Sequence, residues 1–179
     1  MKTKALWAAA TLVATFGTSA LADFSVTSSD LTPGGQISNA QYWSDFGCTG
    51  ENARPEISWQ GAPEATKSFA VTFYDQDAPT GSGFWHWVVF DVPANATGIS
   101  SDSIPAGAME GNTDLGQPGF FGPCPPIGRE HTYTFTVHAL DTDTLEAPEG
   151  ATAALTSFFI NMHSIEQATL SVQAGPRSE

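Results

Sequence analysis

The chain has 179 residues, and 6 Lys and Arg stand against 19 Asp and Glu, which gives a formal net charge of −13 at pH 7. A negative field of that size repels nucleic acid and anionic lipid surfaces, so both are poor partners for this protein. An anionic ligand can bind only in a pocket that supplies its own hydrogen-bond donors.

The first residues have the pattern of a secretory signal peptide. Lys2 and Lys4 precede an apolar run over residues 5–14, and Ala20 and Ala22 offer small side chains at a cleavage site. The alternative, a membrane anchor, needs roughly 20 apolar residues, and this run is far shorter. We therefore predict a signal peptide over residues 1–22 and one exported domain over residues 23–179, periplasmic or secreted, without stable membrane insertion.

Short β-forming runs separated by Gly, Pro, Asn and Ser dominate the first part of the domain. The predicted strands cover residues 24–27, 57–59, 69–74, 85–92 and 132–140. In the last of these, Tyr133, Phe135 and Val137 recur at every second residue, so they should share one face of a sheet.

One segment has helical spacing. Beyond Pro148 and Gly150, apolar side chains recur every three or four residues, which predicts a helix packed across a sheet through Leu155, Phe158, Phe159, Met162 and Ile165 or Glu166. A short strand over residues 169–172 should follow. Many strands with one late helix, and no internal repeat, indicate a single mainly β domain: an antiparallel β-sandwich with a peripheral C-terminal helix.

The two cysteines, Cys48 and Cys124, admit two interpretations. In an exported protein an oxidising compartment favours a disulfide between them. The alternative is a free Cys124 that acts as a nucleophile beside a histidine.

The densest polar signal follows the strand over residues 69–74. The motif Asp75-Gln76-Asp77-Ala78-Pro79 stands at its end, and Trp85-His86-Trp87 comes soon after. Carboxylates at a strand end commonly accept backbone N–H groups in a turn, but one of them could instead orient a histidine. Because side chains alternate along a strand, we expect both tryptophans on one face and His86 on the other.

A rigid loop, Gly122-Pro123-Cys124-Pro125-Pro126, leads to His131-Thr132-Tyr133. Its prolines have no N–H, which leaves the amides of Gly122 and Cys124 as the donors that could face a ligand. The alternative is a stiff connection held by a disulfide, with no ligand. His138 and His163 are assigned structural roles.

The ordered set formed by residues 52–59 (Asn-Ala-Arg-Pro-Glu-Ile-Ser-Trp) and the four motifs above resembles the phosphatidylethanolamine-binding protein family, especially its bacterial Raf kinase inhibitor-like branch. The resemblance runs from about Phe24 to Val172. It implies two antiparallel sheets and an anion pocket lined by Asp75, His86, Gly122, Pro123 and His131, with Tyr133 as a weaker candidate. Gln76 replaces a usual proline and Thr132 a usual arginine, so this chain lacks one positive charge near the pocket.

These observations predict an exported binding protein, not an enzyme, without cofactor or metal. Its ligand would be a small anion such as phosphate or a phospholipid head group. Protonated His86 and His131 and the amides of Gly122 and Cys124 would donate to it, Asp75 would orient an imidazole, and binding would strengthen as the pH falls.

Two other functions stay open at this stage. The first is inhibition of a periplasmic or secreted protease through protein contact. The second is a hydrolase that uses the Asp75, His86 and His131 constellation, although the sequence contains neither an HExxH nor a GxSxG motif.

Overall fold

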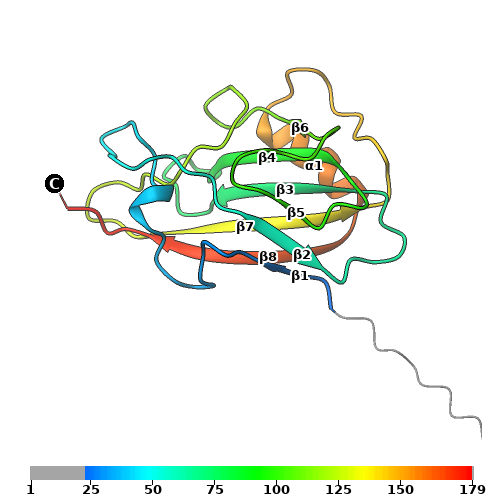
Figure 1. Cartoon of the computed structure of the whole chain (residues 1–179). Coiled ribbons are helices and arrows are strands. Elements are labelled where there is room, and N and C mark those ends of the chain that lie inside the picture. Colours follow the sequence, from blue (N-terminus) through cyan, green and yellow to red (C-terminus); the bar gives the residue numbers. More distant parts are fainter. Residues whose placement is uncertain (1–22, 179) are drawn as a thin grey trace, which may run out of the picture.

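The computed structural model describes residues 23–178, which form a two-sheet sandwich with one α-helix and a short 3-10 helix at Asn39–Gln41. The small sheet has the strand order β1-β2-β5, with β1 at Ser25–Thr27, β2 at Ile57–Gln60 and β5 at Gly98–Ile99. The large sheet has the order β6-β4-β3-β7-β8, with β6 at Met109–Glu110, β4 at Phe84–Pro93, β3 at Ser68–Asp75, β7 at His131–Leu140 and β8 at Ser164–Ala174. All of these strand pairs are antiparallel, and the predicted fold class is confirmed (Figure 1).

The main core lies between the two sheets. Because side chains alternate across a strand, Tyr133, Phe135 and Val137 of β7 share one face, as predicted, and this face lies in the core between the sheets. They meet Ile57 and Trp59 of β2 in one buried cluster. Aromatic rings of paired residues stack closely in this core. Phe73 and Phe135 are partners across β3 and β7, and their ring centroids lie 3.9 Å apart.

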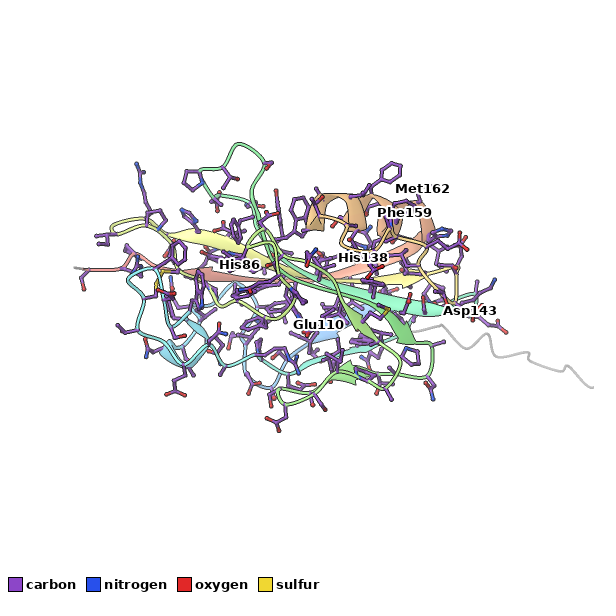
Figure 2. All side chains as sticks on the ribbon, turned by 90° about the horizontal axis from the view of Figure 1, so that it is seen from above. His86, Glu110, His138, Asp143, Phe159 and Met162 are labelled. Atoms are coloured by element: carbon purple, nitrogen blue, oxygen red, sulfur yellow. A yellow bond between two sulfur atoms is a disulfide. The ribbon has the colours of Figure 1, made fainter. Side chains whose placement is uncertain are left out.

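The opposite face of the large sheet is covered by the helix α1, Ala153–His163. Thr152 caps its first turn by accepting a hydrogen bond from the Leu155 N–H at 3.2 Å. Ala153 and Ile160 pack onto a second buried cluster that includes Ala70, Val88 and Leu140 of the sheet. Figure 2 shows the helix on one side of the large sheet and the N-terminal strands on the other.

The helix exists where it was predicted, but its predicted buried face was wrong. Leu155, Phe158 and Met162 are exposed, and the residues turned toward the sheet are Ala153, Thr156, Ser157 and Ile160. This second stripe also has three- and four-residue spacing, and its small side chains let the helix lie close to the sheet. Only Phe159 of the predicted apolar set packs against the cluster below.

The strand after the helix is longer than predicted. Helix α1 ends at His163, and β8 pairs with β7 along its whole length, from Ser164 opposite Leu140 to Ala174 opposite His131. Ile165 and Glu166 therefore belong to a strand. The predicted strand over residues 169–172 was only its most apolar part.

The predicted signal peptide lies in residues 1–22, outside the described part of the chain. Within residues 23–178, no helix has the length and apolar character that a membrane span requires.

Candidate functional site

A pocket of about 190 Å³ opens at one end of the large sheet. Asp75, the last residue of β3, pairs with Phe84 at the start of β4 and with Tyr133 near the start of β7, so three strand ends meet there. The pocket is lined by residues of these ends and of three loops: Trp43, Phe46, Asp75, Ala78, Pro79, Thr80, Phe84, His86, Leu115, Cys124, Pro125, Pro126, His131 and Tyr133. Among the predicted site residues, Asp75, His86, Cys124, His131 and Tyr133 line this one cavity.

Asp75 and His131 form a buried pair at the pocket wall. The imidazole Nδ1 lies 2.8 Å from Asp75 Oδ2, and both residues are at most 6% exposed. The other oxygen, Oδ1, accepts the Asp77 N–H at 2.9 Å. Asp77 in turn accepts the Thr132 N–H at 2.7 Å, which ties the turn to β7. Asp75 thus has both of the roles that the sequence left open: it holds a turn and it orients a histidine.

His86 reaches the pocket through a β-bulge. Phe73 pairs with Trp87 and Tyr74 pairs with Trp85, so His86 is an extra residue in β4. Side chains therefore do not alternate strictly in this part of β4, and the prediction that Trp85 and Trp87 share one face, with His86 on the other, was wrong. Trp87 lies in the core between the sheets, whereas Trp85 packs against the cluster on the helix side.

His86 points to the same side of the sheet as Trp87. Its ring centroid lies 5.7 Å from that of Phe73 and 5.3 Å from that of Tyr133, both of which belong to the core between the sheets. The bulge therefore carries an imidazole to the pocket that a regular strand would have turned toward α1.

His86 is neutral at pH 7. Its Nδ1 lies 2.9 Å from the carbonyl oxygen of Phe121. Burial lowers its pKa to about 4, and the carbonyls of Phe121 and Gly122 together with the charge of Asp75 offset that burial only in part. The expectation that protonated His86 supplies charge near neutral pH is therefore wrong.

Tyr133 keeps its phenolic proton. Burial raises its pKa, and the nearby Asp75 carboxylate raises it further. Within residues 23–178, no group of three or more His, Cys, Asp and Glu side chains is placed to hold a metal ion.

Hydrogen bonds on the side away from the pocket hold the proline-rich loop, and they remove Gly122 from the two predicted backbone donors. The Gly122 N–H donates to Asn52 Oδ1 at 2.7 Å, so that amide is not available to a ligand. A Cβ at Gly122 would collide with the Gln41 carbonyl, which explains the glycine. The Pro123 carbonyl accepts the Trp43 N–H at 3.1 Å. Gly122 and Pro123 support the loop, while Cys124, Pro125 and Pro126 line the pocket.

Asn52 has a role that the sequence analysis did not assign. It adopts a left-handed backbone conformation, with φ of 54°, which asparagine tolerates better than most residues. From there its side chain contacts both the Gly122 N–H and the Phe120 carbonyl. The signal was present, because Asn52 opens one of the recurring motifs, but its partner lies 70 residues away.

A disulfide joins Cys48 to Cys124, with an S–S distance of 2.08 Å. It is the pairing that the export pattern favours, and it removes the alternative of a free Cys124 nucleophile. The bond connects the loop that carries Trp43 and Phe46 to the loop that carries Pro125 and Pro126, so it links two walls of the pocket.

The pocket mouth is aromatic, which the sequence analysis missed. Trp43 and Phe46 stack with their ring centroids 4.7 Å apart, and Phe46 is 70% exposed. Within the described residues, no Lys or Arg lines the cavity. Thr132, at the position of the missing arginine, bonds instead to Gln173 of β8, and Arg129 borders a separate neighbouring hollow.

The two histidines assigned structural roles both lie outside the pocket. His163 Nδ1 bonds the Asp141 carboxylate at 2.8 Å. His138 is buried on the helix side of the large sheet, where its Nε2 lies 3.5 Å from Thr72 Oγ1 and its Nδ1 has no partner in the described part of the chain (Figure 2). Burial lowers the pKa of His138 to about 4.

Replacing His138 with leucine is expected to make the fold more resistant to acid. In the unfolded chain a histidine titrates near pH 6.5, so between pH 6.5 and about 4 the unfolded state binds the proton and stability falls as the pH falls. The loss is on the order of 3 kcal/mol by pH 4. Urea unfolding at pH 7.5 and pH 4 should show the His138→Leu variant losing that much less than the wild type.

The partly exposed His163 provides the control for this measurement. The His163→Gln variant should keep the part of the acid loss that the burial of His138 causes. An equal loss in His138→Leu and wild type would show that the protonation of buried His138 does not contribute to the acid loss.

Comparisons with known proteins agree on one family. A family model described as phosphatidylethanolamine-binding protein matches residues 27–174. The UPF0098 protein YbcL of Escherichia coli (strain K12) is 43% identical over 164 residues, which cover 87% of this chain and 89% of YbcL. The UPF0098 protein YbhB of the same strain is 40% identical over 149 residues, which cover 80% of this chain and 94% of YbhB.

Solved structures show the same fold. The crystal structure of E. coli YbcL matches with a TM-score of 0.83 at 40% identity, over 87% of this chain and 100% of that chain. A carboxypeptidase Y inhibitor, solved in complex with its cognate proteinase, matches with a TM-score of 0.54 at 19% identity, over 86% of this chain and 83% of that chain. The second likeness extends to the fold alone.

Proposed function

The chain belongs to the phosphatidylethanolamine-binding protein family, and from that premise we propose that it binds a small anionic group, phosphate or a phosphate-bearing head group, in the pocket of Asp75, His86 and His131. The proposal assigns binding and not catalysis to the site. It also places the domain outside the cytoplasm after removal of residues 1–22, in keeping with the signal-like N-terminus and the disulfide.

The observation that carries the proposal is the buried pair of Asp75 and His131. A carboxylate can only accept, so it fixes the imidazole with Nδ1–H toward Asp75 and leaves Nε2 for the pocket. When Nε2 is protonated, it offers a charged donor inside a cavity whose walls are largely apolar, where such a bond is stronger than in water.

Phosphate affinity is expected to be roughly 10- to 100-fold higher at pH 5.5 than at pH 8, because the bound anion requires protons that are scarce at pH 8. Isothermal titration calorimetry with sodium phosphate at the two pH values measures this. The charge cannot come from His86 at either pH, since its pKa lies near 4.

The His163→Gln variant serves as the matched control. This partly exposed histidine lies outside the pocket, so its replacement should leave the pH dependence of phosphate binding unchanged. Equal affinity at both pH values would show that a protonated imidazole does not contribute to phosphate binding. Absence of phosphate binding at either pH would reject the proposed function itself.

A further inference from the structure

The two imidazoles of the pocket have opposite hydrogen-bonding capacities. The Phe121 carbonyl can only accept, so the contact at 2.9 Å requires a proton on His86 Nδ1. In a neutral ring the other nitrogen, Nε2, then carries a lone pair and can only accept. Nε2 receives no hydrogen bond from the described residues, so it is the atom that His86 offers to the cavity.

His131 supplies the complementary group. Its Nδ1–H donates to Asp75, and a proton taken up by the ring therefore goes to Nε2, which becomes a donor. The two rings flank the same side chain, with centroids 5.3 Å and 6.3 Å from that of Tyr133. One small ligand in a cavity of about 190 Å³ can thus meet an acceptor and a donor together.

The groups that face these rings keep the arrangement in place. From β3 and the turn after it come Asp75, bonded to His131, and Asp77, bonded to the Thr132 N–H. From β7 comes Tyr133, which stays protonated. The proline-rich loop contributes Cys124, which is held in the disulfide and does not titrate. None of these described groups carries a positive charge, and the Tyr133 hydroxyl has the Asp75 carboxylate as its acceptor.

Building on the proposed function, we propose that the pocket selects an oxyanion that carries its own proton: a phosphate monoester as its monoanion, or dihydrogen phosphate. The P–OH donates to His86 Nε2, and a second oxygen accepts from protonated His131 Nε2. A fully deprotonated oxyanion such as sulfate puts an oxygen lone pair against the His86 lone pair. That mismatch leaves a buried acceptor unsatisfied and adds repulsion.

Charge balance favours the same ligand. The Asp75 carboxylate and a protonated His131 sum to zero, and no Lys or Arg of the described residues lines the pocket. A monoanion therefore adds one negative charge to a chain whose formal charge is already −13, and a dianion adds two. A site with a fixed cation would prefer the dianion, but this site lacks one.

Phosphate monoesters and the phosphodiesters of phospholipid head groups differ in the group that His86 would recognise. A phosphate monoester keeps a P–OH group in weakly acidic solution, whereas the phosphodiester of a phospholipid head group has none. The phosphate group of a diester therefore cannot donate to His86 Nε2. Monoesters should bind more tightly than diesters of similar size.

Calorimetry of the wild-type protein at pH 6 tests the inference with inorganic phosphate, glycerol phosphate, sulfate, dimethyl phosphate and glycerophosphoethanolamine. Phosphate and glycerol phosphate should bind at least about 30-fold more tightly than sulfate and dimethyl phosphate, since a site built to accept from a ligand hydroxyl rejects analogues that lack it. Equal affinity for phosphate and sulfate would overturn the inference, as would tighter binding of either diester than of glycerol phosphate. If none of the five binds, the proposed function fails and not this refinement alone.

The His86→Gln variant tests the residue itself. Its terminal amide can turn an N–H toward the ligand, so the preference for phosphate over sulfate should fall at least about tenfold. An unchanged preference in a folded variant would show that His86 does not select the ligand. The wild-type comparison decides the inference even where this variant fails to fold, and His163→Gln provides the matched control.

Discussion

Replacing His131 with asparagine is expected to lower phosphate affinity at pH 6 by about 30- to 1,000-fold, which corresponds to the roughly 2–4 kcal/mol that charged hydrogen bonds contribute in closed sites. Among the described residues that line the pocket, the His131 imidazole alone can present a charged N–H, because His86 stays neutral and its Nδ1 is already bonded. Asparagine cannot carry that charge, and it leaves the Asp75 carboxylate beside the incoming anion. Titration calorimetry with phosphate measures the loss.

The same substitution should also destabilise the fold, so the two effects need to be separated. Removing one partner of a buried ion pair leaves the other charge uncompensated, at a cost of about 3–5 kcal/mol. The double variant Asp75→Asn/His131→Asn replaces the pair with two neutral amides that can bond each other and the Asp77 N–H. It should regain most of the stability and still fail to bind phosphate.

The double variant makes the prediction decisive. Phosphate binding at wild-type strength by a stable, neutral amide pair would mean that the charge on His131 plays no part in recognition. Loss of binding with recovered stability would assign the effect to the site and not to unfolding.

The two faces of β7 follow from the sequence, whereas the face of His86 does not. Tyr133, Phe135 and Val137 lie in a stretch of β7 that pairs without interruption with β3 and β8. The alternation of side chains along a strand therefore predicts correctly that they share one face. In β4 the ladder is interrupted, because Phe73 and Tyr74 are consecutive while their partners, Trp87 and Trp85, are two residues apart. A bulge depends on the register of both strands, and nothing within residues 85–87 marks it.

The helix shows a similar limit. Apolar spacing locates α1, but two adjacent stripes of the same helix satisfy the spacing rule, and the larger side chains mark the wrong one. The face is decided by how closely Ala153 and Ser157 let the helix approach the sheet, which is a property of packing and not of period.

Motif order identifies the residues of the pocket better than it identifies their roles. Asp75, His86 and His131 come from the ends of three neighbouring strands, so their convergence depends on antiparallel pairing. The role of Gly122 depends instead on Asn52, which lies far away in the sequence and occupies its amide. Long-range contacts of this kind leave no local pattern in a single sequence.

Removing the disulfide is expected to cause the largest loss of stability, about 4–5 kcal/mol in the loop-entropy model, because the bond closes a loop with a sequence separation of 76 residues. The Cys48→Ser/Cys124→Ser variant and the reduced wild-type protein should show the same loss in urea unfolding. Treatment of the double serine variant with dithiothreitol provides the control and should change nothing. A loss below about 1 kcal/mol would mean that other contacts already restrict the unfolded chain or hold both loops.

Phosphate affinity should fall far less than stability in the same variant, by less than about tenfold. The ligand-facing imidazoles stand on β4 and β7, and the Asp75 carboxylate stands on β3, so the strand pairing holds them without the disulfide. The loop behind them keeps its bonds from Trp43 N–H to Pro123 and from Gly122 N–H to Asn52. Calorimetry of the double serine variant, below its unfolding temperature, checks this expectation. A folded variant that no longer binds phosphate would show that the Cys48 loop, with Trp43 and Phe46, forms an essential wall of the site, because the strand residues would still be in place.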